Sequence, residues 1–531
     1  MRRSRAGPSS PPTARDPTGE RPHPSMTSRQ ASLRRRLDVL GLRAQARLDA
    51  DWADRSLPWV VAGVMFAVLF AMSLAVVRQL DGGPGLAIWS QAAWEVQHGN
   101  SPVSSLAGVD PVAHQWAFVA YPLLWLSRWV PTVQLLAGTQ ALALSLAVVP
   151  IWRMARSVFD LRVGTTLAVV ASYAFAPAVH AVNLSLFHPE VIAIPAFAWA
   201  GLYRRQSKWV FYFACIALML VCRADLGITV AALGIVVVVD GDRWPGLATI
   251  GVGVGWTVAA MAILDPQAPS GTLTAGQAFV AQGSAPLAEA RTLFSDPAQV
   301  LGHLTGQQSV VVIVALFAPL LFLGFAAPRT LIPAIPAFVL GIASGQVVQE
   351  AMEAGVPRGT LGAGRVLIAT VPITVAGLVA ISRVGHRSVT RVNVDHRMVA
   401  AIVIASLLLF VQYAPSSPYQ QPWAWGGRDG TDAARMDAVD SLPDGLAVTV
   451  SPSMSALVAE RRTVHEAWLG PPPNPQQWKP STPAVLIDTT GESDTQAPLW
   501  DDDDRAAIET SLERQGYALI STGEGILVFR R

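Results

Sequence analysis

Long apolar stretches separated by short polar loops dominate the sequence between residues 57 and 413. The first, Leu57 to Val77, holds about 20 mostly apolar residues, enough for a helix to cross a hydrocarbon core of about 30 Å. Comparable stretches lie near residues 133–152, 163–182, 191–203, 209–223, 226–239, 246–264, 307–326, 330–349, 366–381 and 398–413. The pattern predicts an all-α polytopic membrane bundle of about 11 transmembrane helices.

Basic residues cluster in three of the loops between these stretches. They are Arg153, Arg156 and Arg162; Arg204, Arg205 and Lys208; and Arg383, Arg387, Arg391 and Arg397. Because arginine and lysine are retained on the cytoplasmic side, we expect all three loops to be cytoplasmic. The sequence therefore predicts a multi-pass protein of the plasma membrane, with its N-terminus in the cytoplasm and its C-terminal region outside.

Two segments between the first and second spans have a mixed pattern. From residue 86 to residue 98, apolar residues fall on one helical face, and Gln91, Glu95 and His98 fall on another. This pattern predicts a helix that lies in the outer interface, with the second face either solvated or lining a site. The segment Trp116 to Val130 is apolar but short and contains a proline, so we expect it to re-enter the membrane without crossing it.

The chain divides by composition into three parts. Residues 1–56 are polar at first and basic afterwards, which predicts a disordered, basic cytoplasmic N-terminus. Residues 57–413 form the transmembrane domain. Residues 414–531 are ordinary globular sequence and predict a small extracytoplasmic α/β domain, and we expect residues from about 428 to 531 to fold when expressed alone. Its expected strands are 446–450, 484–488, 517–521 and 525–529, and its expected helices are 454–459 and 503–515.

Composition also indicates a multi-span membrane protein. The chain is 51% hydrophobic and only 14% charged, which excludes an ordinary soluble multidomain protein. We expect membrane lipids as partners and no nucleic acid. Cys215 and Cys222 lie in one apolar stretch, so no disulfide framework is predicted. The acidic run Asp501 to Asp504 fits a helix start better than a calcium site, because acids favour the positive end of a helix. No metal site is predicted, and the cofactor is left open.

Two short charged motifs inside apolar sequence mark the candidate site. They are Phe187-His188-Pro189-Glu190 and Arg223-Ala224-Asp225-Leu226-Gly227. Ionisable groups are costly at membrane depth, so they usually line a cavity or pair with each other. The arms around the second motif have about 14 or 15 residues each, about 21–22 Å of helix, so we expect a recessed hairpin turn. Glu190 as a helix-dipole partner and Arg223–Asp225 as a simple ion pair remain alternatives.

These residues also carry a resemblance. The run Gly85 to Trp94, followed by His98-Gly99, His114, the His-Pro-Glu block and Asp225, resembles DUF2079, a multi-span membrane protein family of unknown function related to the GT-C glycosyltransferases. The resemblance implies a GT-C-like fold and a polyprenyl-phosphate sugar as substrate outside the membrane. The family usually has acids where this chain has Gly85 and Ser90, and Glu where it has Ala224.

Two hypotheses of different classes follow. In the first, the protein transfers a sugar from a polyprenyl-phosphate donor to a glycan acceptor on the outer face. His188, Glu190 and Asp225 are then the catalytic candidates, and the substrate-binding candidates are Arg223, Gln91, Glu95 and His114. In the second, the protein is a non-catalytic membrane scaffold or a lipid- or glycan-binding protein that lacks the family's first-loop acids.

Overall fold

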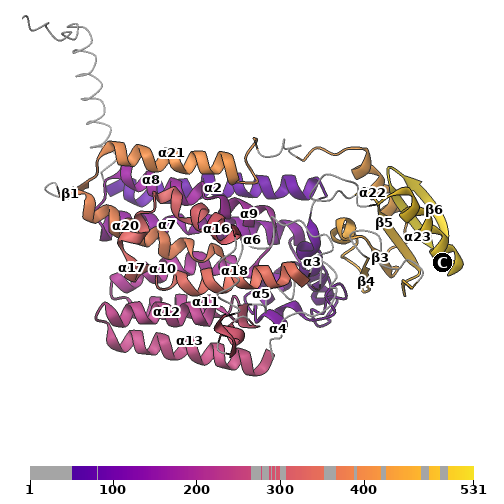
Figure 1. Cartoon of the computed structure of the whole chain (residues 1–531), viewed down its shortest axis with the longest axis horizontal. Helices are drawn as coiled ribbons and strands as arrows, with labels where there is room; N and C mark the ends of the chain where they lie inside the picture. The colour runs from indigo at the N-terminus through magenta and orange to yellow at the C-terminus, as the bar shows by residue number, and fades with distance from the viewer. Residues whose placement is uncertain are drawn as a thin grey trace, which may run out of the picture. The chain divides into compact units, whose positions relative to one another are not determined.

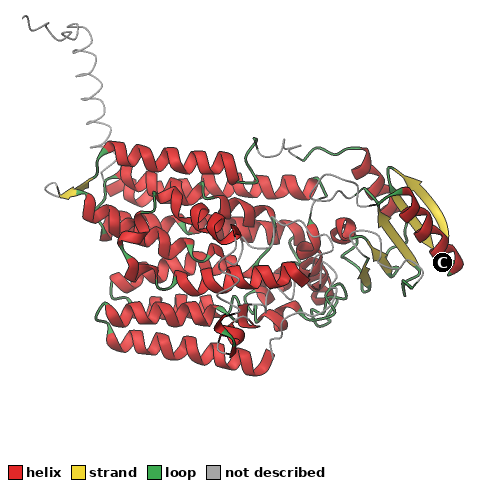
Figure 2. Ribbon diagram, viewed as in Figure 1, coloured by secondary structure: helices red, strands yellow, loops and turns green. Residues whose placement is uncertain are grey.

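The computed structural model is built mainly from helices (Figures 1 and 2). It describes residues 51–80, 82–264, 277, 286–288, 290–293, 295–298, 307–351, 366–387, 391–419, 426–467, 477–490 and 500–531. Residues 1–50, which are most of the predicted disordered and basic N-terminus, lie outside the described residues. The boundaries of the three predicted parts are not tested by the structure.

Many of the helices of the apolar region follow one another along the chain with short connections. They are α2 (Asp51–Arg78), α3 (Gly83–Gln97), α4 (Pro111–Gln115), α5 (Ala120–Leu126), α6 (Thr132–Leu146), α7 (Val148–Arg153), α8 (Val163–Ala174), α9 (Pro177–Leu184), α10 (Ala193–Arg205), α11 (Trp209–Leu220), α12 (Leu226–Val239), α13 (Arg243–Leu264), α16 (Gln307–Phe317), α17 (Pro328–Leu331), α18 (Ala334–Ala351), α20 (Thr370–Val384) and α21 (His396–Tyr413). Most of these helices run roughly parallel or antiparallel to one another (Figure 1).

Several helices have the length and apolarity that a membrane requires. Among the described residues, four are long and apolar enough to cross it: Trp52–Arg78, Thr132–Val158, Arg243–Leu264 and His396–Tyr413. Shorter apolar helices occupy Trp209–Leu220, Leu226–Val239 and Thr370–Val384. A mostly helical protein with several apolar helices is therefore confirmed, and the number of about 11 spans stays a prediction.

At least three of the predicted spans, 163–182, 307–326 and 330–349, are not continuous helices, and the first two show the clearest breaks. The stretch 163–182 contains α8 and α9, which are bent by 43° at a break before Pro177. The stretch 307–326 is helical only as far as Phe317, and two 3₁₀ turns follow it. Proline explains both breaks, because it removes a backbone donor and clashes with the preceding turn. Pro177 opens α9, and Pro319 lies in the first of the 3₁₀ turns.

Glycines allow α12 and α13 to pack closely. A Cβ atom at Gly253 of α13 would lie 2.6 Å from the backbone nitrogen of Ala231, and one at Gly234 of α12 would lie 2.7 Å from the backbone nitrogen of Ile250. Gly227 and Gly246 meet the facing helix at similar distances. Small residues at such contacts are typical of helix pairs in membranes. This pair fixes the position of the turn that precedes α12.

The C-terminal part contains a five-stranded mixed sheet in the order β4-β3-β5-β7-β6. Its strands are β3 (Val448–Val450), β4 (Val464–Glu466), β5 (Ala484–Asp488), β6 (Ala518–Gly523) and β7 (Ile526–Arg530). Strands β3, β4 and β5 are parallel, and β7 is antiparallel to β5 and β6. The helices α22 (Gly430–Asp440) and α23 (Asp502–Arg514) accompany the sheet. The four predicted strands are present, whereas β4 and α22 were not predicted.

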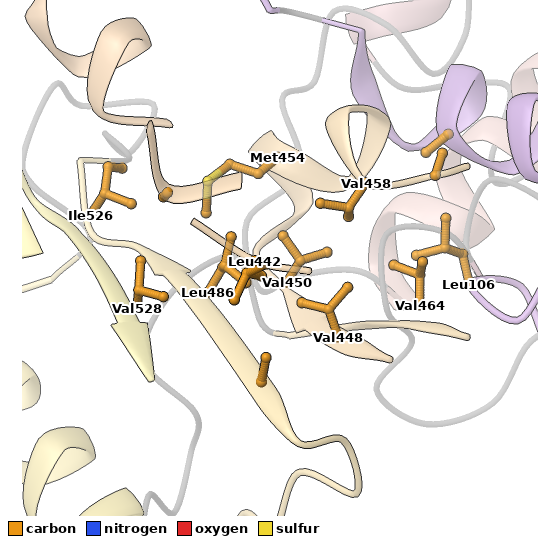
Figure 3. Packing of buried hydrophobic residues seen from close by; sticks show 14 of the residues in the cluster. Leu106, Leu442, Val448, Val450, Met454, Val458, Val464, Leu486, Ile526 and Val528 are labelled. Atoms are coloured by element: carbon orange, nitrogen blue, oxygen red, sulfur yellow. The ribbon is translucent and has the colours of Figure 1, made fainter. Parts of the chain in front are cut away.

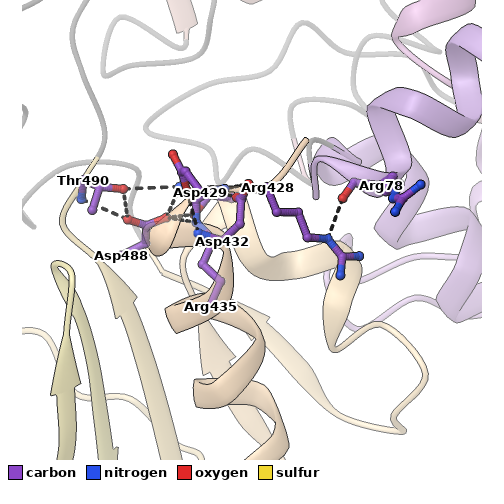
Figure 4. A network of polar contacts seen from close by, with 8 residues as sticks. Arg78, Arg428, Asp429, Asp432, Arg435, Asp488 and Thr490 are labelled. Carbon is purple, nitrogen blue, oxygen red and sulfur yellow. Dashed lines mark hydrogen bonds and ion pairs between the residues drawn. The ribbon is translucent and has the colours of Figure 1, made fainter. Parts of the chain in front are cut away.

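The acidic helix start is confirmed as a cap. The Asp501 side chain accepts a hydrogen bond from the backbone nitrogen of Asp504, and both bonds of a capping box are present. A second capping box, between Asp429 and Asp432, opens α22. It adjoins a polar network in which Arg435 bridges Asp432 and Asp488 (Figure 4).

The core of the C-terminal sheet includes residues from the apolar region. Val448, Val450 and Leu486 belong to one cluster with Leu106, from the loop after α3 (Figure 3). Ile88 of α3 belongs to the same cluster. The other side of the sheet packs against α23. Part of the core of residues 414–531 therefore comes from residues 87–107, and independent folding of the part from about residue 428 stays a prediction.

Candidate functional site

The site is built on the turn between α11 and α12. This turn is held by the segment that carries α4 and α5, because the backbone nitrogen of Val119 donates to the carbonyl of Val221 at 3.0 Å. The backbone nitrogen of Ala224 donates to the carbonyl of Gln115, also at 3.0 Å. Non-helical backbone at membrane depth is tolerated only where the protein or a wet cavity satisfies it. Here the protein satisfies it from the neighbouring segment.

Arg223 is the centre of the site and is only 3% exposed. Its Nη1 donates to Glu190 Oε1 at 2.7 Å. Its Nε donates to Asp225 Oδ1, and its Nη2 donates to Asp225 Oδ2 at 2.9 Å. The Arg223–Asp225 ion pair expected as an alternative is thus present, and Glu190 joins it. Three of the five guanidinium N–H groups are used by carboxylates, which leaves at most two for another anion.

His188 lies beside Glu190 in the same turn. Its Nδ1 is 3.6 Å from Glu190 Oε1, and its Nε2 is 2.9 Å from the hydroxyl oxygen of Ser185. The backbone nitrogen of His188 donates to Gln140 Oε1 at 2.7 Å. Pro189 then opens a 3₁₀ turn, Pro189–Ile192, that leads into α10. The structure therefore brings His188, Glu190, Arg223 and Asp225 together.

The charges of this cluster do not cancel. One guanidinium faces two carboxylates, so these three groups carry a net charge of −1 when all are ionised. All three residues are buried. A buried ion pair is retained only when its geometry and hydrogen bonds repay the cost of desolvation. The extra carboxylate gives the cluster a proton acceptor that the guanidinium alone does not neutralise.

A small pocket adjoins the cluster. Arg223, Asp225, Leu226 and Thr229 line one side of it, and residues of α18 line another. Its cavity volume is about 10 Å³, which is about the room that one water molecule needs. The pocket as it stands therefore has room for about one water molecule beside Arg223 and Asp225.

Gln91 and Glu95 lie in α3, and their side chains are buried instead of facing water. Gln91 is fully buried: its Nε2 donates to Ser105 Oγ and to the carbonyl of Arg461, at 2.8 and 3.0 Å. Its Oε1 accepts from Ser104 Oγ at 2.7 Å and from the backbone nitrogen of Leu106. Glu95 is 6% exposed and accepts from Asn100 at 2.7 Å. The prediction of a solvated face is wrong for Gln91 and Glu95, because the C-terminal sheet and the following loop cover α3. His98 alone is exposed.

His114 lies in α4, next to the residue that binds the turn. Asp110 caps this helix by accepting from the backbone nitrogens of Val112 and Ala113. Gln115 follows and accepts the hydrogen bond from Ala224. Burial lowers the pKa of His114 below its usual value of 6.5, so the imidazole is neutral at neutral pH. His114 thus belongs to the segment that supports the turn.

Two polar residues of the site were not singled out from the sequence. Ser185 precedes His188 by three residues, and Gln140 is a polar residue inside an apolar span. Gln140 also donates to the carbonyl of Val182 at 2.6 Å, so it joins both ends of the turn that carries His188. A glutamine well inside a predicted span was the available signal. Ser185 gave none, since serine is common in turns.

Comparison with known proteins places the chain in a family. The sequence profile described as "Predicted membrane protein (DUF2079)" matches residues 80–528. No curated protein matches. Among solved structures, one that resembles the chain is the cryo-EM structure of the arabinofuranosyltransferase AftD from Mycobacteria, with a TM-score of 0.47 and 14% sequence identity. That match covers 90% of this chain and 40% of the other, so this chain spans about two fifths of that protein's length.

Proposed function

Because this chain belongs to the DUF2079 family of predicted membrane proteins, we propose a function that uses the membrane: transfer of a sugar from a polyprenyl-phosphate donor to a glycan acceptor on the outer face. The observation that supports it is a buried arginine paired with two carboxylates, one of which lies beside an imidazole. Paired carboxylates beside a histidine can accept and relay a proton, which a hydroxyl acceptor must lose in the reaction.

In this reaction the acceptor hydroxyl gives its proton to a carboxylate of the cluster. The acceptor oxygen bonds to the anomeric carbon while the bond from that carbon to the phosphate oxygen breaks, and polyprenyl phosphate leaves. Glu190 and Asp225 are the candidate bases. Arg223 pairs with both carboxylates, and His188 orients Glu190 and carries the proton toward Ser185.

The donor phosphate would compete with Asp225 for Arg223. The cluster carries a net charge of −1, so it does not attract an anion as it stands. A phosphate that takes the Nε and Nη2 donors of Arg223 would release the Asp225 carboxylate, which then becomes free to act as the base. Arg223 and Asp225 both line the small pocket, so in this scheme binding of the phosphate opens the pocket and frees the base at the same time.

Of the other substrate-binding candidates, we keep only His114. It lies in the segment that holds the Arg223 turn, and so it is placed to sense or contact a ligand there. Gln91 and Glu95 are committed to hydrogen bonds around α3. We assign both to the support of the fold.

The test is turnover by the full chain in lipid nanodiscs. The probes are polyprenyl-phosphate monosaccharides labelled in the sugar, and the readout is released polyprenyl phosphate. Asp225→Asn and Glu190→Gln should each lower turnover by about 10² or more if they remove the base. Glu513→Gln, on the exposed surface of α23, is the control. Equal turnover in the control and both site variants would contradict the proposal.

A lipid- or glycan-binding scaffold is the second candidate function. The closed state of the cluster favours it, because all the carboxylates face Arg223 and the adjoining pocket has a volume of only about 10 Å³. In that case the labelled lipid binds without any release of polyprenyl phosphate, and neither Asp225→Asn nor Glu190→Gln changes the reaction products.

A further inference from the structure

The strand β6 forms one edge of the C-terminal sheet. It pairs with β7 on one side, and all six of its residues are exposed. Leu519 is 38% exposed and Ile520 is 53% exposed. The pairing with β7 has an irregularity between Leu519 and Ser521, which leaves Ile520 projecting. Within the part of the chain that the structure describes, no strand pairs with the outer side of β6.

The opposite edge of the same sheet is covered. There, Ser105 Oγ donates to the carbonyl of Val464 at 2.9 Å and accepts from its backbone nitrogen at 2.8 Å. The loop after α3 thus occupies the backbone groups of Val464, the first residue of β4. Proteins usually protect an edge strand with charged residues or proline, and residues 518–523 contain neither. The edge at β4 is therefore protected by the loop after α3, whereas the edge at β6 is left open for pairing.

Charge differs between the two ends of β6. At its beginning, Arg530 lies opposite Ala518 on the neighbouring strand. Arg531 is close as well, since its Nε is 3.8 Å from the place of a Cβ at Gly516. At the other end, the exposed Glu524 follows Gly523. An antiparallel copy of β6 would bring each Glu524 to the end of the other copy's β6 near which Arg530 and Arg531 lie, one strand in from the edge, whereas a parallel copy would bring like charges to the same end.

We propose that β6 pairs with β6 of a second copy of this chain, in antiparallel orientation about a two-fold axis. The two sheets then form one continuous sheet across a homodimer. Such a contact is isologous, so it closes at two copies and does not form a fibre. The backbone groups of both edges bond to each other, and the Glu524 carboxylates meet Arg530 or Arg531 of the partner copy.

The membrane helps this pairing. A six-residue strand spans about 20 Å, and its pairing is weak between molecules free in solution. Anchoring both copies in one bilayer raises their effective concentration, which strengthens a weak contact without any new interaction. The dimer should accordingly form in membranes and dissociate on dilution in detergent.

Cysteine crosslinking of the full chain in membranes tests the contact. The background carries Cys215→Ser and Cys222→Ser, and single cysteines are introduced as Leu519→Cys, Ile520→Cys, Ser521→Cys or Thr522→Cys. In an antiparallel pair the central positions 520 and 521 come within disulfide reach of the other copy, so oxidation should give a dimer there. Thr510→Cys, exposed on α23, should give little.

Charge reversal tests the orientation. Glu524→Arg should lower crosslinking at position 520 or 521 by about tenfold, because it places like charges together. Adding Arg530→Glu and Arg531→Glu should restore it, which a folding defect of the single variant would not allow. Glu524 also lies beside Gly430 of α22, so the single variant could disturb this contact within one copy. Recovery of crosslinking in the combined variant is therefore the decisive result.

Two results would overturn the proposal. One is crosslinking that is equally strong at Thr510→Cys and at the β6 positions, which indicates random collision. The other is a dimer that forms at position 520 or 521 but does not respond to either charge reversal, because an antiparallel pair must bring those charges together.

Discussion

Arg223 is held by two carboxylates at once, and this determines how its loss should act. Arg223→Ala leaves Glu190 and Asp225 buried beside each other without their cation. Breaking a buried pair in this way costs about 3–5 kcal/mol, so the full chain in detergent should melt well below the wild type. Thermal unfolding followed by tryptophan fluorescence measures the difference.

The matched control for this variant is Arg204→Ala. Arg204 pairs with Asp240 at 2.8 Å, and the Asp240 side chain is 37% exposed, so water can replace the lost cation. Its loss should cost about 1 kcal/mol or less. The triple variant Glu190→Gln, Arg223→Met, Asp225→Asn removes all the charges and should recover most of the lost stability. A triple variant as unstable as Arg223→Ala would argue against a charge effect.

Gln91 offers a second test at the scale of one residue. Gln91→Ala would leave the buried partners Ser104, Leu106 and Arg461 without their hydrogen bonds. Each unsatisfied buried group costs about 1–3 kcal/mol, so proteolysis of the C-terminal sheet should become faster. His98→Ala, at an exposed position of the same region, should leave the cleavage rate unchanged. Equal rates for both variants would mean that α3 does not hold the sheet.

At the scale of the residue, the sequence predicted the charged cluster, but the prediction that Gln91 faces water was wrong. Charges persisting in apolar sequence are informative because they are expensive in a membrane, which is why Arg223 and Glu190 stood out. An amphipathic pattern says only that one face is polar. It does not say whether water or another part of the chain covers that face, and the segment that covers Gln91 is about 370 residues away.

Among the elements, the α12–α13 pair gives the sharpest contrast. Gly253→Ala would place a Cβ 2.6 Å from two backbone atoms of α12, so the helices must separate. Gly251→Ala, two residues earlier on the exposed side, meets nothing within 4 Å and should stabilise α13 by up to about 1 kcal/mol. Thermal unfolding should therefore rank Gly251→Ala at or above wild type and Gly253→Ala well below it. The reverse order would contradict the close packing.

The C-terminal sheet should lose stability in acid through Asp488. Burial alone would raise the pKa of Asp488, but hydrogen bonds from Ser453 and Thr490 and the charge of Arg435 outweigh it and lower the pKa below 3.8. A lowered pKa stabilises the folded state above the unfolded value, and this contribution is lost as pH falls through the folded value. Asp488→Asn should remove that part of the acid dependence in hydrogen exchange of β5, whereas Asp437→Asn, exposed on α22, should keep it.

The elements themselves were partly predictable. Hydrophobic periodicity located most helices and four strands, because it reports burial directly. The breaks at Pro177 and Pro319 were missed because one proline hardly changes the mean hydropathy of a span. Strand β4 was missed because it has only three residues, and it is an edge strand completed by Ser105 from a distant loop.

For the whole molecule, orientation is the first prediction. The basic loops predict that Arg391 lies in the cytoplasm and that the C-terminal part lies outside. A reporter that is active only in the cytoplasm should work when fused after Arg391 and fail when fused after Gly427, and a reporter active only outside should do the reverse. The opposite pattern would remove the argument for a site that opens outward.

The way the parts combine could not be read from the sequence. Residues after 414 have the composition of a soluble fold, yet Ile88 and Leu106 belong to their core. Composition describes a segment by itself, whereas a shared core depends on which surfaces meet. The same limit applies to the site: the motifs were visible, but the occupation of Arg223 by both carboxylates was not.

The central claim is that the Arg223 cluster acts on a phosphate-bearing lipid, and identification of the lipid that co-purifies with the full chain tests it most directly. Mass spectrometry of lipid extracted from the wild type should show a polyprenyl phosphate or its sugar conjugate. Asp225→Asn should retain that lipid, since it keeps Arg223, and Arg223→Met in the charge-free triple variant should lose it. Only bulk phospholipid, in the same amounts from all three proteins, would contradict the account.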